Sequence, residues 1–426
     1  MKDKELERTM IALIKNYFKP YHGLPREIYV IFVARMINAM GVFVWPLLMI
    51  LMDQELNMSP QESGFVMMIG GFLYTFSSLI GGKLTDTIGR KRVLIIFDSL
   101  AAVCYIACAF TPMSMMTIYL ILGAMFFYGL SDPAHGAIIA DLTNKENREN
   151  AFSLTYLGFN LGFAIGPTIG GLLFSKKMFF IFFMGDAITA LIAVILVLIY
   201  VPETINKTKD DTEFSDLEKN VDGSIFSIIL KRPVLIAFSV IMLGFNFVYQ
   251  QWSFLMPLHA STAYGDTGAA LYGFLASFNG AVVILFTPYL TTKLEGQRNT
   301  WRIFIGGLFY LFGFGILGFI ATRSAFFLTV FLMTLGEIIV VISFTPFIIN
   351  HTPASHRGRM NSVLPMIIGL GHTVSPYIMG TVLGYISIPR AWNLISIIMI
   401  ISLLGMYVLD RSEKQKLLKP QAQFEA

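Results

Sequence analysis

Charged side chains are scarce in this chain. Only 14% of its 426 residues are Asp, Glu, Lys or Arg, whereas about a quarter is usual for a soluble domain. Hydrophobic residues make up 55% of the chain, and the mean hydropathy is +0.67. Too few polar side chains are present to cover a water-soluble globule, so the apolar excess is expected to face lipid. These values exclude an ordinary soluble protein and predict an all-α integral membrane protein.

Cysteine and the common chemical motifs are also scarce. Cys104 and Cys108 lie in an apolar stretch without metal-ligand partners, and we assign both to packing. No Gly-x-x-x-x-Gly-Lys-Ser/Thr loop occurs, which argues against a self-contained ATP-driven pump. No His/Asp/Glu cluster has metal-ligand spacing, which counts against a membrane enzyme or sensor. We therefore expect neither a metal nor a nucleic-acid partner.

The first residues show no secretory signal peptide. Residues 1–27 instead place Leu6, Met10, Leu13 and Phe18 at helical spacing among basic residues. This pattern predicts an amphipathic cytoplasmic segment on the membrane surface, with a frayed basic tail as the alternative.

Long apolar runs predict twelve membrane-spanning helices, since a bilayer core requires about 20 apolar residues per helix. We expect these helices near 28–51, 62–84, 93–111, 115–141, 151–175, 178–201, 233–259, 268–292, 301–321, 325–350, 359–386 and 390–409. The charged stretch 202–232 cannot lie in lipid. It is expected to link two six-helix halves, 28–201 and 233–410, and residues 411–426 form a tail.

The positions of the positive charges predict the orientation of the chain. With the N-terminus inside, all but five of the 31 Lys and Arg residues fall on the inner side. The exceptions are Lys176, Lys177, Arg323 and Arg390 outside, and Arg35 within the membrane. Both termini and the linker are therefore expected in the cytoplasm, and a bacterial plasma membrane is the natural setting.

The two halves resemble one another in sequence. A shift of 209 residues aligns Arg148 with Arg357, Ser153 with Ser362, Gly162 with Gly371, Pro167 with Pro376, and Gly171 with Gly380. Duplicated six-helix halves around a site at the membrane midplane are a transporter architecture. We would not expect this repeat in a channel or a receptor.

Two motifs stand out within the predicted first half. The loop after the second span carries Gly82, Asp86, Gly89, Arg90 and Lys91. Gly89 permits a tight turn there, and Asp86 is able to cap a neighbouring helix N-terminus; a solvated basic loop is the alternative. The fifth span carries small residues that allow close helix approach and a proline that bends the helix, with plain packing as the alternative. These residues are Gly158, Gly162, Gly166, Pro167, Gly170 and Gly171.

The loop resembles the cytoplasmic signature of the major facilitator superfamily, and the fifth span resembles a motif of its drug/proton antiporters. The resemblance extends over nearly the whole chain, including residues 144–148, 202–204, 252–259 and 335–337, to multidrug/proton antiporters of the lactococcal type in Gram-positive bacteria. It implies the major facilitator fold and alternating access by rocking of two bundles. It also implies that Asp86 reaches the helix that starts near Arg359, and that Arg90 pairs with Asp141. Thr87 departs from the pattern, because an arginine is usual there, and residues 250–253 lack an acid that these relatives carry in helix seven.

Ionisable residues inside predicted spans indicate candidate coupling sites, because charge is costly in lipid. Glu337 lies about 13 residues from the inner end of its helix, roughly 20 Å deep. Its apolar neighbours favour a protonated carboxyl, and we predict that Glu337 carries the proton. A protonated glutamic acid that holds helices together is the alternative.

Arg35 and Asp132 have matching depths on helices that adjoin by resemblance. They are predicted to form a gating or coupling pair, and a structural salt bridge is the alternative. His135 is expected on the face of Asp132, Asp98 at the membrane interface, and Asp186 is a weaker candidate.

Polar and amphipathic residues within the spans suit a large, weakly polar substrate pocket, with lipid anchoring or helix–helix hydrogen bonding as the alternative. They are Asn38, Trp45, Asn160, Asn246, Tyr249, Gln250, Trp252 and Asn279.

We interpret the chain as a proton-coupled antiporter that exports amphipathic or hydrophobic small molecules, including several drugs. The competing interpretation is an exporter or flippase of one defined substrate, such as a lipid, siderophore or sugar. No cofactor other than the proton gradient is expected. The expected partners are the substrate, protons and membrane lipid, and the chain is expected to act as a monomer.

Overall fold

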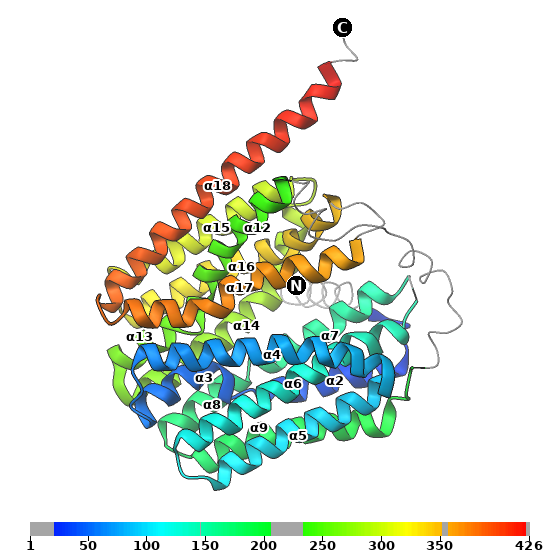
Figure 1. The fold of residues 1–426 in the computed structure, drawn as a ribbon, viewed down its shortest axis with the longest axis vertical. Coiled ribbons are helices and arrows are strands. Elements are labelled where there is room, and N and C mark those ends of the chain that lie inside the picture. Colours follow the sequence, from blue (N-terminus) through cyan, green and yellow to red (C-terminus); the bar gives the residue numbers. More distant parts are fainter. Residues whose placement is uncertain (1–20, 145, 206–232, 352–356, 423–426) are drawn as a thin grey trace, which may run out of the picture.

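A computed structural model describes residues 21–144, 146–205, 233–351 and 357–422. Helices form this part of the chain, and no β-strand occurs in it. Figure 1 shows two bundles side by side, one built from the blue-to-green first half and the other from the green-to-red second half. The last turns of the C-terminal helix project beyond the second bundle.

The first bundle contains the elements before residue 205. They are α2 (Arg26–Met40), α3 (Val44–Ile50), η2 (Leu51–Glu55), α4 (Pro60–Ile88), α5 (Arg90–Phe110), α6 (Met115–Asp141), α7 (Arg148–Phe163), α8 (Gly166–Ser175) and α9 (Phe179–Tyr200).

The second bundle contains the elements after residue 232. They are α12 (Pro233–Tyr249), η4 (Gln250–Trp252), α13 (Leu255–Tyr264), η5 (Gly265–Thr267), α14 (Gly268–Lys293), α15 (Asn299–Ile316), α16 (Arg323–Asn350), α17 (Arg357–Val382) and α18 (Ile388–Ala422).

Nine helical segments of the described chain are long and apolar enough to cross a membrane. One of them, Pro233–Lys293, has 61 residues and contains two crossings, α12 to α13 and then α14. The shorter α15 and the more polar α17 complete the second bundle. Most of the predicted N-terminal segment (1–27) and of the predicted linker (202–232) lies outside the described residues, which omit 1–20 and 206–232.

Local sequence signals determine where these helices begin and end. Ser59 and Glu62 form a capping box before α4, and Pro60 occupies its first turn. Gly89 separates α4 from α5 with a φ of 116°, which a residue with a Cβ rarely adopts. We call the end of the molecule that contains Gly89, Asp141 and Thr204 the linker end. The opposite end, where α4 and α14 begin, is the far end.

Three of the predicted spans are interrupted rather than continuous. The first breaks between α2 and α3, the fifth between α7 and α8, and the seventh around η4. Asp186 of α9 stabilises the first break, because its carboxylate accepts hydrogen bonds from the backbone N–H groups of Phe43 (3.3 Å) and Val44 (3.2 Å). Asp186 therefore satisfies backbone groups that lipid would leave without a partner.

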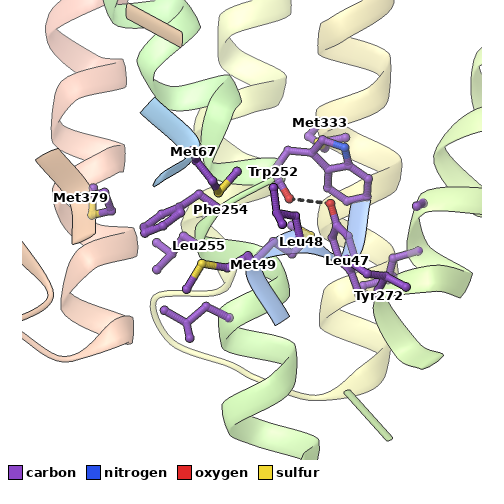
Figure 2. Packing of buried hydrophobic residues seen from close by; sticks show 14 of the residues in the cluster. Leu47, Leu48, Met49, Met67, Trp252, Phe254, Leu255, Tyr272, Met333 and Met379 are labelled. Carbon is purple, nitrogen blue, oxygen red and sulfur yellow. Dashed lines mark hydrogen bonds between the residues drawn. The ribbon is translucent and has the colours of Figure 1, made fainter. Parts of the chain in front are cut away.

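The main apolar cluster includes residues from both halves. Figure 2 shows Leu47, Leu48 and Met49 of α3 among side chains of the second half, including Phe254 and Tyr272. A second cluster at the linker end contains only first-half residues, among them Ile28, Val93 and Ile138. The helix α3 is the part of the first span that lies nearer the far end. The shared apolar core thus connects the two bundles through α3.

Close backbone contacts also join the halves at the far end, and the 209-residue repeat relates them in pairs. A Cβ atom on Gly64 would lie 2.2 Å from the carbonyl oxygen of Pro376. In the related pair, a Cβ atom on Gly273 would lie 2.3 Å from the carbonyl oxygen of Pro167. A second related pair behaves alike. A Cβ atom on Gly380 would lie 2.2 Å from the carbonyl oxygen of Pro60, and one on Gly171 would lie 2.6 Å from the carbonyl oxygen of Ala269. Only glycine permits these approaches.

Side-chain hydrogen bonds reinforce this closure at the far end. Ser175 of α8 accepts from the backbone N–H of Ala270 on α14 at 3.1 Å. Gln54 of η2 donates to the Ser261 hydroxyl at 2.8 Å, and that hydroxyl donates to Asp53 at 3.0 Å. The two bundles are therefore held together at the far end.

Candidate functional site

A charged cluster at the linker end contains the loop motif. Arg90 begins α5, and its guanidinium contacts Asp141 at 3.1 Å and Asp86 at 3.4 Å. The expected pair of Arg90 and Asp141 is present, and both side chains are largely buried. Asp86 is 73% exposed. The helix α17 begins at Arg357, directly after residues 352–356, which lie outside the described residues, and the expected contact of Asp86 there stays a prediction.

Glu203 completes this cluster, and the sequence did not single it out as a site residue. Its carboxylate accepts hydrogen bonds from the backbone N–H groups of Arg90 (2.9 Å), Lys91 (3.4 Å) and Arg92 (3.3 Å). It therefore caps the N-terminus of α5, where the helix dipole favours negative charge. The next residue, Thr204, donates to Asp141 at 2.7 Å. The chain that leaves α9 thus ties α5 to the linker.

The capping contacts determine how Glu203 titrates. Partial burial alone would raise its pKa, yet hydrogen bonds from backbone N–H groups, including those of Thr204, Arg92 and Lys91, hold the pKa below its ordinary value. A carboxyl whose pKa is lowered in the folded state stabilises that state fully above its unfolded pKa. The contribution disappears as the pH falls through the folded pKa.

We expect Glu203→Ala to lower the stability of the folded protein by about 1–2 kcal/mol at pH 7, the usual cost of losing a helix cap. Because the cap acts only when ionised, the deficit should shrink as the pH falls below about 4, beneath the ordinary glutamate pKa. Thermal unfolding of the purified protein in detergent, followed at several pH values, measures both effects. Glu295→Ala, at an exposed residue of the loop between α14 and α15, is the matched control and should cost little. A deficit that is equal at pH 7 and at acid pH would contradict the capping role.

The second candidate site surrounds Glu337 on α16. Asn279 of α14 donates from Nδ2 to the Glu337 carboxylate at 3.0 Å and to the Thr334 hydroxyl at 2.8 Å. Tyr249 of α12 is within hydrogen-bonding reach of the same carboxylate. Among the described residues, no Lys, Arg or His nitrogen lies within 4.0 Å of Glu337. The carboxyl is thus partly buried among neutral hydrogen-bonding groups and has no counter-ion there.

A cleft between the two halves shares a neighbour with this carboxyl, the side chain of Tyr156. It has a volume of about 380 Å³ and lies between α7 and α14 on the linker side of the molecule. Its polar side chains are neutral and include Ser153, Tyr156, Asn160 and Thr287. Tyr156 is near enough to Glu337 to interact with it electrostatically. The halves therefore join at the far end and separate between α7 and α14 nearer the linker end.

The structure does not pair Arg35 with Asp132. No ion pair joins them among the described residues, although the Tyr74 hydroxyl interacts electrostatically with both. Asp132 is exposed. Asp98 forms the ion pair of this region instead, with its carboxylate 3.2 Å from Nε2 of His135. Asp98 was expected at the membrane interface, and its side chain is buried in the bundle, with 6% of the residue exposed; its depth in the membrane stays a prediction.

The polar residues proposed for the substrate pocket do not form one group. Asn160 lines the cleft, while Tyr249 and Asn279 contact Glu337. Asn246 donates to its own helix, at Met242. Gln250 is 2% exposed, and its Oε1 has no hydrogen-bond partner in the described part of the chain.

The remaining candidates lie elsewhere. Asn38 lines a small cavity inside the first half. Trp45 packs against the main apolar cluster, and Trp252 lies within it. The ring of Trp252 packs on Tyr272, whose hydroxyl donates to the Trp252 carbonyl at 3.0 Å (Figure 2).

The glycines of the fifth span make two kinds of contact. Gly158, Gly162, Gly166 and Gly170 lie against the first span, where a Cβ on Gly162 would be 2.2 Å from the Met36 carbonyl oxygen. Gly171 and the Pro167 carbonyl face α14 of the other half. Gly82 has open space around it.

Two pseudo-symmetric bundles, an uncompensated carboxyl deep in one of them and a cleft between them define the class of membrane transporters. The chain belongs to the Major Facilitator Superfamily, whose family model matches residues 31–376. The predicted all-α architecture of two six-helix bundles is thereby confirmed.

Similar proteins have several different names. A Na(+), Li(+), K(+)/H(+) antiporter of Planococcus maritimus is 23% identical over 78% of this chain and 84% of its own length. Multidrug resistance protein 2 of Bacillus subtilis is 24% identical over 66% of this chain and 68% of its own length. A crystal structure of a mutant of the peptide transporter POT in complex with sulfate has a TM-score of 0.74, with 16% identity over 93% of this chain and 96% of that one. This structural likeness concerns the fold alone.

Proposed function

We propose that the chain is a proton-coupled exporter of amphipathic small molecules, with Glu337 as the group that exchanges a proton for the substrate. The observation that carries this proposal is that the described part of the chain places no counter-ion beside the Glu337 carboxyl. A carboxyl among neutral partners is costly to ionise in a dry site, and it becomes easier to ionise when water or a cation approaches. Its protonation state is therefore expected to change with conformation and with substrate.

The neutral cleft supports a substrate of low polarity. Its hydroxyl, amide and aromatic groups offer hydrogen bonds without fixing one charge pattern. A cationic amphipathic molecule that enters between α7 and α14 would meet Glu337 as the first acid near its path. The unpaired Oε1 of buried Gln250 provides a further acceptor. Arg35 and Asp132 remain proposed gating residues of the first half.

Exchange of a monovalent metal cation for a proton is a second candidate. The name of the relative from Planococcus maritimus favours it, as do the oxygen-bearing side chains of Asn279, Thr334 and Tyr249 around Glu337. An exporter or flippase of one lipid, siderophore or sugar remains the other candidate. Proteoliposomes with an imposed pH gradient decide among these when the same preparation is offered ethidium, sodium, potassium and a panel of neutral amphiphiles. Uptake of ethidium and related amphiphiles without movement of sodium or potassium would support the first proposal.

We also propose that the linker end faces the cytoplasm of a bacterial cell, with both termini on that side. Glu146 and Lys176 are both exposed, and they lie at opposite ends of the first bundle. In a background with Cys104 and Cys108 replaced by alanine, an impermeant thiol reagent should label Lys176→Cys in intact cells. It should label Glu146→Cys only after the cells are permeabilised. The reverse pattern would invert the topology.

A further inference from the structure

A small cavity lies inside the first bundle, apart from Glu337 and the cleft. It is bounded by α2, α5, α6 and α9 and has a volume of about 20 Å³. This is enough for one water molecule, which needs roughly 10–15 Å³. Arg35, Asn38, Asp98 and His135 contribute the polar part of its lining. The rest of the lining is apolar, so these ionisable groups inside a membrane bundle are candidates for a function.

Asp98 and His135 are in direct contact beside this cavity. One carboxylate oxygen of Asp98 lies 3.2 Å from Nε2 of His135, and the other accepts a hydrogen bond from the Ser131 hydroxyl. The side chain of Asp98 is 8% exposed and that of His135 is 17% exposed. The second ring nitrogen of His135, Nδ1, has no hydrogen-bond partner among the described residues. One nitrogen is thus held by the carboxylate, and the other is left for a proton.

The surroundings restrict what this pair can bind. The charged or titratable groups that face it are Arg35 from α2, Tyr74 from α4, and Tyr128 and Asp132 from α6. The element α9 presents only Ala193 and Val197 to the cavity. A guanidinium and an imidazole beside a single buried carboxylate disfavour a metal cation. A proton needs only one free nitrogen and a water molecule to reach it.

We propose that Asp98 and His135 form a second proton-binding site, which takes up one proton on His135 independently of Glu337. The Nε2–H group of His135 donates to Asp98 in both the neutral and the protonated imidazole. The hydrogen bond to the carboxylate therefore persists when the proton on Nδ1 leaves. The cavity has room for one water molecule, which could carry that proton. His135 lies six residues before Asp141, or about 9 Å from the linker end along α6, and Glu337 lies about twice as deep. The use of this site in transport rests on the proposed function, whereas its protonation does not.

The experiment measures the protonation state of the His135 imidazole directly. Protein labelled with ¹⁵N-histidine, in lipid nanodiscs or proteoliposomes without substrate, is titrated from pH 5 to pH 9 by solid-state NMR, and His135→Gln assigns the His135 signal. We expect His135 to change its protonation state within this range in the wild type and in Glu337→Gln alike. Asp98→Asn should reduce the charged fraction of His135 at pH 7 at least threefold.

A second variant guards against misfolding of Asp98→Asn. Ser131→Ala leaves both members of the pair in place and removes one hydrogen bond to the carboxylate, so it should change the His135 titration measurably but less. An invariant His135 signal from pH 5 to pH 9 would overturn the proposal. So would a charged fraction at pH 7 that folded Asp98→Asn leaves unchanged, or a His135 titration that Glu337→Gln displaces. Because no gradient and no substrate are used, these outcomes are independent of whether ethidium is exported.

Discussion

Proteoliposomes that contain Glu337→Gln should fail to accumulate ethidium in response to a pH gradient, yet should still exchange labelled for unlabelled ethidium across the membrane. Glutamine resembles the protonated acid in shape and hydrogen bonding, and it cannot release a proton. Asn279 and Tyr249 can still contact it, so the fold is expected to persist. The variant therefore separates binding and alternation, which it retains, from coupling, which it loses.

The expected effect is large. A gradient of one pH unit supplies about 1.4 kcal/mol per proton, which sustains about tenfold accumulation. The wild type should approach this ratio for exchange of one proton, and Glu337→Gln should remain near unity.

Matched controls make the result specific to Glu337. Glu295→Gln makes the same chemical change at an exposed position and should accumulate ethidium as the wild type does. Glu337→Asp retains a carboxyl group and should keep partial coupling. If Glu337→Gln still accumulates ethidium at the wild-type ratio, coupling lies elsewhere, and Asp132 and the pair of Asp98 and His135 become the groups to examine.

The sequence predicted the helices well because lipid imposes a simple requirement on the chain. Apolar runs of sufficient length indicate spans without any knowledge of their partners. Apolar runs do not indicate the breaks in three spans, although Pro167 had predicted a bend in the fifth. At the first break, Asp186 supplies acceptors to the N–H groups of Phe43 and Val44, and these residues are far apart in the sequence.

The site was predicted less completely than the fold. Glu337 stood out because it is an isolated acid in an apolar helix, and Arg90 and Asp141 followed from a family resemblance. Matching depths on helices that adjoin by resemblance suggested that Arg35 pairs with Asp132, but neither depth nor helix order says which way a side chain points around its helix. The same limitation hid Asp98, which points into the bundle toward His135. Glu203 was part of a resembling segment, yet only the fold shows that it reaches the start of α5.

The 209-residue repeat acquires a physical meaning from the contacts at the far end. It relates Gly64 to Gly273 and Pro376 to Pro167, and each glycine meets the carbonyl oxygen of a proline in the opposite half. The repeat seen in the sequence predicted that Pro167 and Pro376 are equivalent, and the same shift extends to the two glycines. It could not predict that they face the other bundle.

Gly64→Ala and Gly273→Ala should each open the far end and reduce transport roughly fivefold or more. The added Cβ would lie 2.2 or 2.3 Å from a backbone oxygen, and a backbone cannot rotate away as a side chain can. Overpacking of this kind costs about 1–3 kcal/mol. That cost applies only to the state in which the far end is closed, so it changes the ratio of closed to open molecules by roughly 5- to 150-fold. Spin labels at Lys176 and Asp266, both exposed near the contact between α8 and α14, report the opening as a longer distance.

Gly369→Ala is the matched control for this effect. Gly369 lies in α17, the helix that also carries Pro376 and Gly380, and a Cβ added to it would meet no atom within 4 Å. The control should therefore transport ethidium at the wild-type rate and keep the distance between Lys176 and Asp266. A second label pair at Glu146 and Lys293, near the linker end, should move closer in Gly64→Ala if the bundles rock as the family resemblance implies, since bundles that part at one end then approach at the other. If folded Gly64→Ala and Gly273→Ala leave both distances unchanged, these glycine contacts do not hold the far end closed, and the repeat reflects ancestry alone.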